Sequence, residues 1–152
     1  MTPEEERVAD LVRRAFYGVT LGNGVGLLHG QGLDDYADRQ TLAQYRAKDE
    51  KLDWTRIGVT ELNRCHSSLS FFDAEGMRFH LPAYLIADLE GTLNQDIVVH
   101  LFYFEHGAKS RFALLDSDQR RAVRQFLLLR RSDRPFDWEM IDKALSGYWA
   151  ET

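Results

Sequence analysis

The densest group of side chains able to do chemistry lies between residues 73 and 80. It comprises Asp73, Glu75, Arg78 and His80, close together along the chain. A carboxylate beside an imidazole can set the tautomer of the ring and exchange a proton with it, and an arginine can hold an anion. These four residues form the candidate binding site, and Glu75, Arg78 and His80 are its candidate catalytic residues. In the competing structural interpretation, Asp73 satisfies turn amides and Arg78 pairs with a carboxylate such as Glu61 or Asp88. His80 then lies on the solvent face of the hairpin or caps the following helix.

The other chemical candidates have simpler explanations. Gly22-Asn-Gly-Val-Gly26 looks like a phosphate-binding loop, but a predicted helix precedes it and no Gly-Lys-Ser/Thr follows. The histidines do not form His-Glu-x-x-His, and the single cysteine, Cys65, excludes a cysteine-rich zinc site. We therefore expect no metal and no cofactor, and a core position for Cys65. Asp49, Glu50 and Trp54 form a second polar and aromatic cluster, which we also expect to be structural.

The segment that carries the four candidates predicts a β-hairpin over residues 68–81. Asp73-Ala-Glu-Gly76 suits a type I turn with a bulge, and apolar and polar side chains alternate from Met77 to Leu81. A lone hairpin is unstable in water. We therefore expect it to pack against the apolar helix that Pro82 opens.

Most of the remaining chain has helical patterns. Thr2 and Glu5 predict a capping box for a helix over residues 3–17. Further helices are expected over 34–51, from Asp53 to about Cys65 with a break near Gly58, over 117–131 and from about Asp137 onward. Residues 95–104 fit a strand through Ile97-Val98-Val99 or a helix capped by Asn94, and the helix is preferred. Side chains expected to face the core include Tyr36, Leu42, Tyr45, Leu52 and Trp138. The predicted fold class is α+β: a single, mostly helical domain over residues 1–152, with one short antiparallel β-hairpin packed on a buried helix. An all-α fold with an irregular hairpin is the alternative.

Charge and composition favour a protein partner over nucleic acid or membrane. The net charge is −5, and residues 61–106 hold seven acidic and only two basic side chains, whereas phosphate binding needs clustered cations. No segment reaches the ~20 apolar residues that span a bilayer. The single cysteine suits a reducing compartment. We expect a cytoplasmic protein whose acidic region faces a basic surface on a protein partner; the oligomeric state stays open.

Residues 72–85, Phe-Asp-Ala-Glu-Gly-Met-Arg-Phe-His-Leu-Pro-Ala-Tyr-Leu, resemble the signature of a family of small uncharacterised bacterial proteins that share a domain of unknown function. Three outlying pieces are also similar: Phe16-x-Gly-Val, Asp49-Glu50-x-x-Asp53-Trp54, and Phe112-x-Leu-Leu followed by Gln119 and Phe126-Leu127. The resemblance therefore spans most of the chain. It implies a bacterial, cytoplasmic protein and implies no activity, cofactor or catalytic residue.

Three functions stay open at the level of sequence. The preferred one is a non-enzymatic protein-binding module, such as a toxin-neutralising immunity protein. The alternative is a small hydrolase or isomerase that uses Glu75 and His80 on the hairpin, and it requires these side chains to converge in a pocket. The third is a small-ligand sensor built on buried aromatic residues.

Overall fold

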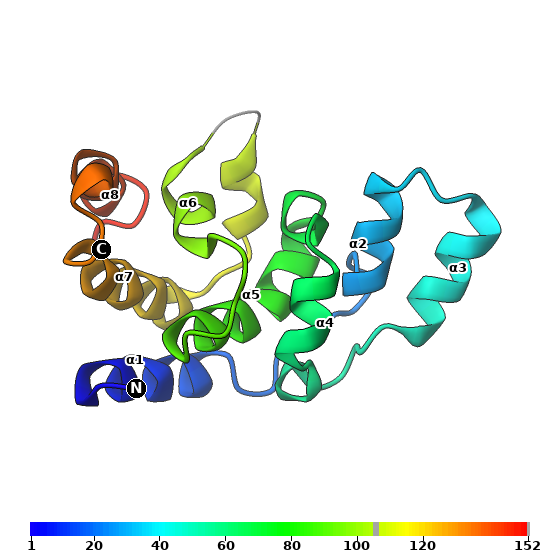
Figure 1. The fold of residues 1–152 in the computed structure, drawn as a ribbon, viewed down its shortest axis with the longest axis horizontal. Coiled ribbons are helices and arrows are strands. Elements are labelled where there is room, and N and C mark those ends of the chain that lie inside the picture. Colours follow the sequence, from blue (N-terminus) through cyan, green and yellow to red (C-terminus); the bar gives the residue numbers. More distant parts are fainter. Residues whose placement is uncertain (105–106, 152) are drawn as a thin grey trace.

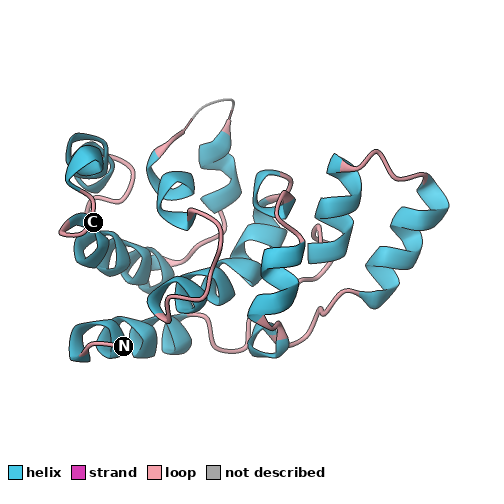
Figure 2. Cartoon of the chain, in the orientation of Figure 1, coloured by secondary structure: helices cyan, strands magenta, loops and turns pink. Residues whose placement is uncertain are grey.

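The computed structural model describes residues 1–104 and 107–151, and in these ranges it contains helices and loops but no strand (Figure 2). The α-helices are α1 (Pro3–Ala15), α2 (Leu27–Asp34), α3 (Arg39–Lys48), α4 (Val59–Arg64), α5 (Ala74–Leu89), α6 (Ile97–Phe102), α7 (Ser117–Arg131) and α8 (Trp138–Ser146). Single turns of 3₁₀ helix lie at η1 (Trp54–Arg56), η2 (Ser68–Ser70), η3 (Ala108–Phe112) and η4 (Pro135–Asp137). None of the helices described is both long and apolar enough to cross a bilayer. The fold class is therefore all-α.

The predicted β-hairpin over residues 68–81 is wrong. Its first half is the 3₁₀ turn η2, and its second half is the beginning of α5. Asp73 is the N-cap of α5 and accepts a hydrogen bond from the backbone N–H of Gly76 at 2.8 Å. The same Asp-x-x-Gly sequence suits a turn and a helix cap, because in both a short carboxylate accepts from a backbone amide nearby. Helix α5 also continues through Pro82, which does not open it.

Helix α5 lies at the centre of the molecule, and eleven of its sixteen residues are buried. The residues from Met77 to Leu85 include an almost unbroken run of buried side chains, so no polar stripe faces solvent. In such a helix an alternating apolar pattern does not indicate a strand, because side chains on nearly all faces of the helix are buried. Tertiary burial, and not local periodicity, decides the structure of this segment.

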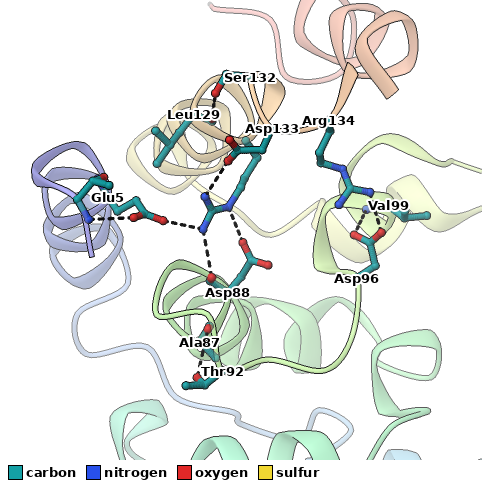
Figure 3. Close-up of polar contacts among 12 residues, drawn as sticks. Glu5, Ala87, Asp88, Thr92, Asp96, Val99, Leu129, Ser132, Asp133 and Arg134 are labelled. Carbon is teal, nitrogen blue, oxygen red and sulfur yellow. Dashed lines mark hydrogen bonds and ion pairs between the residues drawn. The ribbon is translucent and has the colours of Figure 1, made fainter. Parts of the chain in front are cut away.

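Helices α1 and α7 pack together beside α5, and one arginine of α7 joins all three helices (Figure 3). Arg130 Nε donates to Asp88 Oδ2 of α5 at 2.7 Å, and a second guanidinium nitrogen donates to Glu5 Oε2 of α1 at 3.0 Å. Its side chain is 14% exposed. The network is therefore largely screened from water, so removal of its arginine should cost more than removal of one partner of a surface ion pair.

Helices α2 and α3 form a helical arm at one end of the molecule (Figure 1). Helix α3 packs chiefly on α2 and contributes no buried side chain to the core. The helix expected over residues 34–51 is confirmed only for Arg39–Lys48, because α2 ends at Asp34 and the chain reverses at Tyr36 before α3 begins. Tyr36 and Leu52, both expected in the core, are 95% and 74% exposed.

Other helix predictions are confirmed where the signals are local. The capping box joins Thr2 and Glu5 in both directions. Asp53 caps η1, and Gly58 separates η1 from α4. Trp138, however, is 43% exposed and so lies outside the core. The confirmed predictions concern helix caps and a helix break. They depend on residues three or four positions apart, whose contacts the local sequence determines.

We expect replacement of Arg130 by alanine to lower the free energy of unfolding by about 2 kcal/mol, because two partly buried carboxylates lose their partner. Arg13→Ala is the matched control. It removes an ion pair with Asp10 in which both side chains are largely exposed, and it should cost no more than about 0.5 kcal/mol. Urea denaturation of both variants measures the difference, and equal losses would contradict the role of the network.

Candidate functional site

Asp73 and Glu75 use their carboxylates to hold the glycine-rich loop of residues 18–26 against α5. Asp73 Oδ1 accepts from the backbone N–H of Val25 at 3.0 Å, and Glu75 Oε2 accepts from that of Asn23 at 3.2 Å. The loop thus does cradle anionic groups, but these are carboxylates of the same chain. A Cβ added to Gly76 would lie 2.5 Å from the carbonyl oxygen of Val25. The glycine there is required by the close approach of loop and helix.

Arg78 lies on another side of α5. It lines a surface pocket with residues 17–20 and Asp116. The carboxylates expected to pair with it are engaged elsewhere, since Glu61 pairs with Arg64 and Asp88 pairs with Arg130. Arg78 therefore does not join Glu75 and His80 in one site.

His80 is fully buried, although it was expected on the polar face of a hairpin. Its ring stacks on Phe72 with the two centroids 4.3 Å apart. Nδ1 lies 2.7 Å from the carbonyl oxygen of Gly76. Because a carbonyl oxygen can only accept, Nδ1 must carry the proton. Burial lowers the pKa of His80 to about 4, against the opposing effect of this hydrogen bond, so the ring is neutral near pH 7.

The other ring nitrogen of His80, Nε2, is buried and has no hydrogen-bond partner. In the neutral ring with a proton on Nδ1, Nε2 carries a free lone pair and acts only as an acceptor. His80 lines a pocket of about 220 Å³ between α2, the end of α3, η1 and α4. We call this the His80 pocket; it is lined by Leu27, Leu28, Lys48, Asp49, Glu50, Arg56, Ile57, Gly58, Glu61 and His80.

Asp49 forms one wall of the His80 pocket and also holds the N-terminus of α2. Its two carboxylate oxygens accept from the backbone N–H groups of Leu28 at 2.7 Å and His29 at 3.2 Å. Burial raises the pKa of the Asp49 carboxyl, although these two hydrogen bonds act in the opposite direction. Sequence reasoning placed Asp49 in a structural cluster, and its link to α2 spans 20 residues or more, which no local motif reveals.

The structure does not bring the four predicted site residues together. Asp73 and Glu75 bind the glycine-rich loop, Arg78 lines one pocket and His80 lines another. An acid–base pair of Glu75 and His80 would need the two side chains within hydrogen-bond reach, yet each has a different partner. Among the described residues, no three His, Cys, Asp or Glu side chains are arranged to hold a metal ion.

Residues 4–152 match the model of a protein family described as "Family of unknown function (DUF6714)". The chain belongs to the DUF6714 family. Membership confirms the expected relation to a family of unknown function, while the role of residues 72–85 as its signature stays a prediction. No curated protein and no solved structure matches this DUF6714 chain.

The lowered pKa of His80 predicts a pH dependence of the stability of this DUF6714 protein. In the unfolded chain the ring takes up a proton near its ordinary pKa of about 6.5, whereas in the folded protein it does so only at about pH 4. The stabilisation by the neutral ring is therefore complete above pH 6.5 and is lost as the pH falls to 4. We expect the free energy of unfolding to fall by on the order of 3 kcal/mol more in wild type than in His80→Phe over this interval.

Urea denaturation at half-unit pH steps measures this difference, and the carboxylates common to both proteins cancel in the comparison. The control is His66→Ala, which removes an exposed histidine and should follow the wild-type curve. Parallel curves for wild type and His80→Phe would show that the ring is not kept neutral.

Proposed function

We propose that this protein is a non-enzymatic protein-binding module whose contact surface is the tip of the helical arm. We define the arm tip as residues 34–38, the turn between α2 and α3. The observation that carries the proposal is Tyr36, which is 95% exposed at the end of the arm. Tyrosine supplies a large apolar surface and a polar hydroxyl, and it is enriched among residues that dominate protein–protein affinity.

The backbone at Tyr36 supports a role outside folding. Its φ is +55°, and among the described residues it is the only non-glycine with a positive φ. A tyrosine in this left-handed region costs about 1–2 kcal/mol relative to the right-handed one. A glycine at position 36 would remove this strain. The exposed tyrosine side chain gains no burial that would offset the strain. Binding supplies the stabilising contact that the free protein lacks.

The charges of the arm tip indicate the chemistry of the partner. Asp34, Asp35 and Asp38 flank Tyr36 along the chain, and none of them forms an ion pair within the part of the chain that the structure describes. Asp38 accepts from the backbone N–H of Thr41 at 2.7 Å, and Asp35 accepts from the Gln31 amide at 3.2 Å. Three uncompensated carboxylates around an exposed aromatic ring complement a basic surface.

The acidic stretch of residues 61–106 supports this role less well than its composition suggests. Glu61, Asp88 and Asp96 pair with arginines of the same chain, and Asp73 and Glu75 bind backbone amides. These charges contribute to folding. We therefore propose that the basic surface of the partner contacts the arm tip and not this stretch. A toxin bound by its immunity protein would be such a partner.

Tyr36→Gly is the variant that separates binding from folding. It removes the aromatic ring and relieves the strain, while the added freedom of the unfolded chain offsets part of that gain. We expect its free energy of unfolding to stay within about 0.5 kcal/mol of wild type or to exceed it. Loss of an interface residue worth at least 2 kcal/mol should weaken partner binding about 30-fold or more.

The partner is first isolated from the native host on immobilised wild-type protein, and its affinity is then measured by calorimetry for each variant. Tyr17→Ala is the matched control, because Tyr17 is 88% exposed but lies far along the chain from the arm. It should bind like wild type, and Asp34→Asn/Asp35→Asn should reduce both the affinity and its dependence on salt. A partner that binds Tyr36→Gly as tightly as wild type, or the absence of a stoichiometric partner, would overturn the proposal.

A further inference from the structure

Arg78 is a partly buried arginine without a partner. Every other arginine of the described chain that is not exposed donates a hydrogen bond, whereas Arg78 forms neither a hydrogen bond nor an ion pair there. Its Nε is buried without an acceptor, which costs hydration that nothing in the fold offsets. A lysine would reach the same place without a buried donor, because its stem is aliphatic. Folding therefore does not explain the guanidinium.

The two terminal nitrogens of Arg78 are the accessible part of the group. They have no partner among the described residues but, unlike Nε, they are not sealed from solvent. Arg78 lines a pocket of about 440 Å³ between the end of α1, the first turns of α5 and the beginning of α7. We call this the Arg78 pocket; it is lined by Ala15, Tyr17, Gly18, Val19, Thr20, Arg78, Leu114, Asp116 and Gln119. A ligand there can reach a charged, planar fork of free N–H donors, which suits a carboxylate.

Asp116 gives the same pocket a charge of the opposite sign. No ion pair joins it to Arg78 or to any other described residue. One of its oxygens accepts from the backbone N–H of Gln119 at 2.8 Å and so caps α7, and the other has no hydrogen-bond partner in the described chain. A simple anion would be attracted by Arg78 and repelled by Asp116. A molecule that carries both charges is attracted by both.

We infer that the Arg78 pocket binds a free amino acid, whose carboxylate accepts two hydrogen bonds from Arg78 and whose ammonium group pairs with Asp116. This inference goes beyond the proposed function and does not depend on the arm tip. The pocket volume of about 440 Å³ equals roughly fifteen water molecules at about 30 Å³ each. An amino acid with its side chain fits in that space.

The walls of the Arg78 pocket are fixed before a ligand binds. Gln119 Nε2 donates to the carbonyl oxygen of Ala15 at 3.2 Å, and Gln119 Oε1 accepts from the backbone N–H of Asp116 at 2.9 Å. One side chain thus joins the end of α1 to the beginning of α7 and occupies the carbonyl oxygen of Ala15. Binding therefore needs little ordering of the protein, which favours affinity for a small ligand.

L-alanine, N-acetyl-L-alanine and L-alaninamide are the probes that test the inference. The first carries both charges, the second lacks the ammonium group and the third lacks the carboxylate. Each compound is titrated into ¹⁵N-labelled protein at neutral pH, and the backbone amide signals of residues 18–20 report binding. We expect a Kd for L-alanine in about the millimolar range. Each of the other two should bind at least about tenfold more weakly, because it loses one charge-assisted contact.

Three variants show whether the difference arises in the Arg78 pocket. Arg78→Lys keeps the charge but loses the planar fork, and it should weaken the binding of L-alanine at least about fivefold. Asp116→Asn still provides a cap for α7, and it should reduce the preference for L-alanine over N-acetyl-L-alanine to about onefold while the preference over L-alaninamide remains. Arg7→Lys, at an exposed position of α1, is the control and should bind all three compounds like wild type.

The comparison of the three compounds on wild-type protein decides the matter even if a variant does not fold. Equally tight binding of N-acetyl-L-alanine and L-alanine would show a site for carboxylates alone and would overturn the inference. Equal binding of all three compounds, amide shifts elsewhere only, or no saturable binding of L-alanine would overturn it too. A folded Arg78→Lys variant that binds L-alanine like wild type would have the same consequence.

Discussion

The structure depends on one constraint: a helix buried on nearly every side must satisfy its own polar groups, because water does not reach them. Helix α5 meets this constraint at its N-terminus through Asp73, which caps the helix and holds the glycine-rich loop at the same time. At its other end, Asp88 binds Arg130 and so joins α5 to α7. The carboxylates at the two ends of α5 are thereby used for folding.

Several buried polar atoms have no hydrogen-bond partner among the described residues, including Arg78 Nε and Tyr84 Oη of α5, and two further features also oppose folding. His80 lies inside α5 with one nitrogen satisfied by its own helix and the other free beside a pocket. The arm tip carries an exposed tyrosine in a strained conformation and three carboxylates without ion pairs. Both features reduce the stability of the free protein, and folding explains neither of them. The arm tip is exposed as well, and for this reason it is the place where we propose contact with a protein partner.

The sequence predicted local contacts well and distant ones poorly. The Thr2–Glu5 capping box and the break at Gly58 follow from residues a few positions apart, and the structure contains both. The hairpin failed because Asp-x-x-Gly fits a turn and a helix cap equally well, and because burial on all sides hides the periodicity of α5. Tyr36 was placed in the core because its spacing fits one long helix. Asp49 caps a helix that begins 22 residues before it, and that relation depends on the tertiary fold.

The protonation of His80 is the most direct test of this account, since the free acceptor exists only if Nδ1 carries the ring proton. Two-dimensional ¹H–¹⁵N spectra of the histidine side chains at pH 6.5 distinguish the two neutral tautomers and the charged ring. We predict a neutral His80 with a protonated Nδ1 and an unprotonated Nε2, consistent with a pKa of about 4. A proton on Nε2, in either the other tautomer or the imidazolium, would contradict the account.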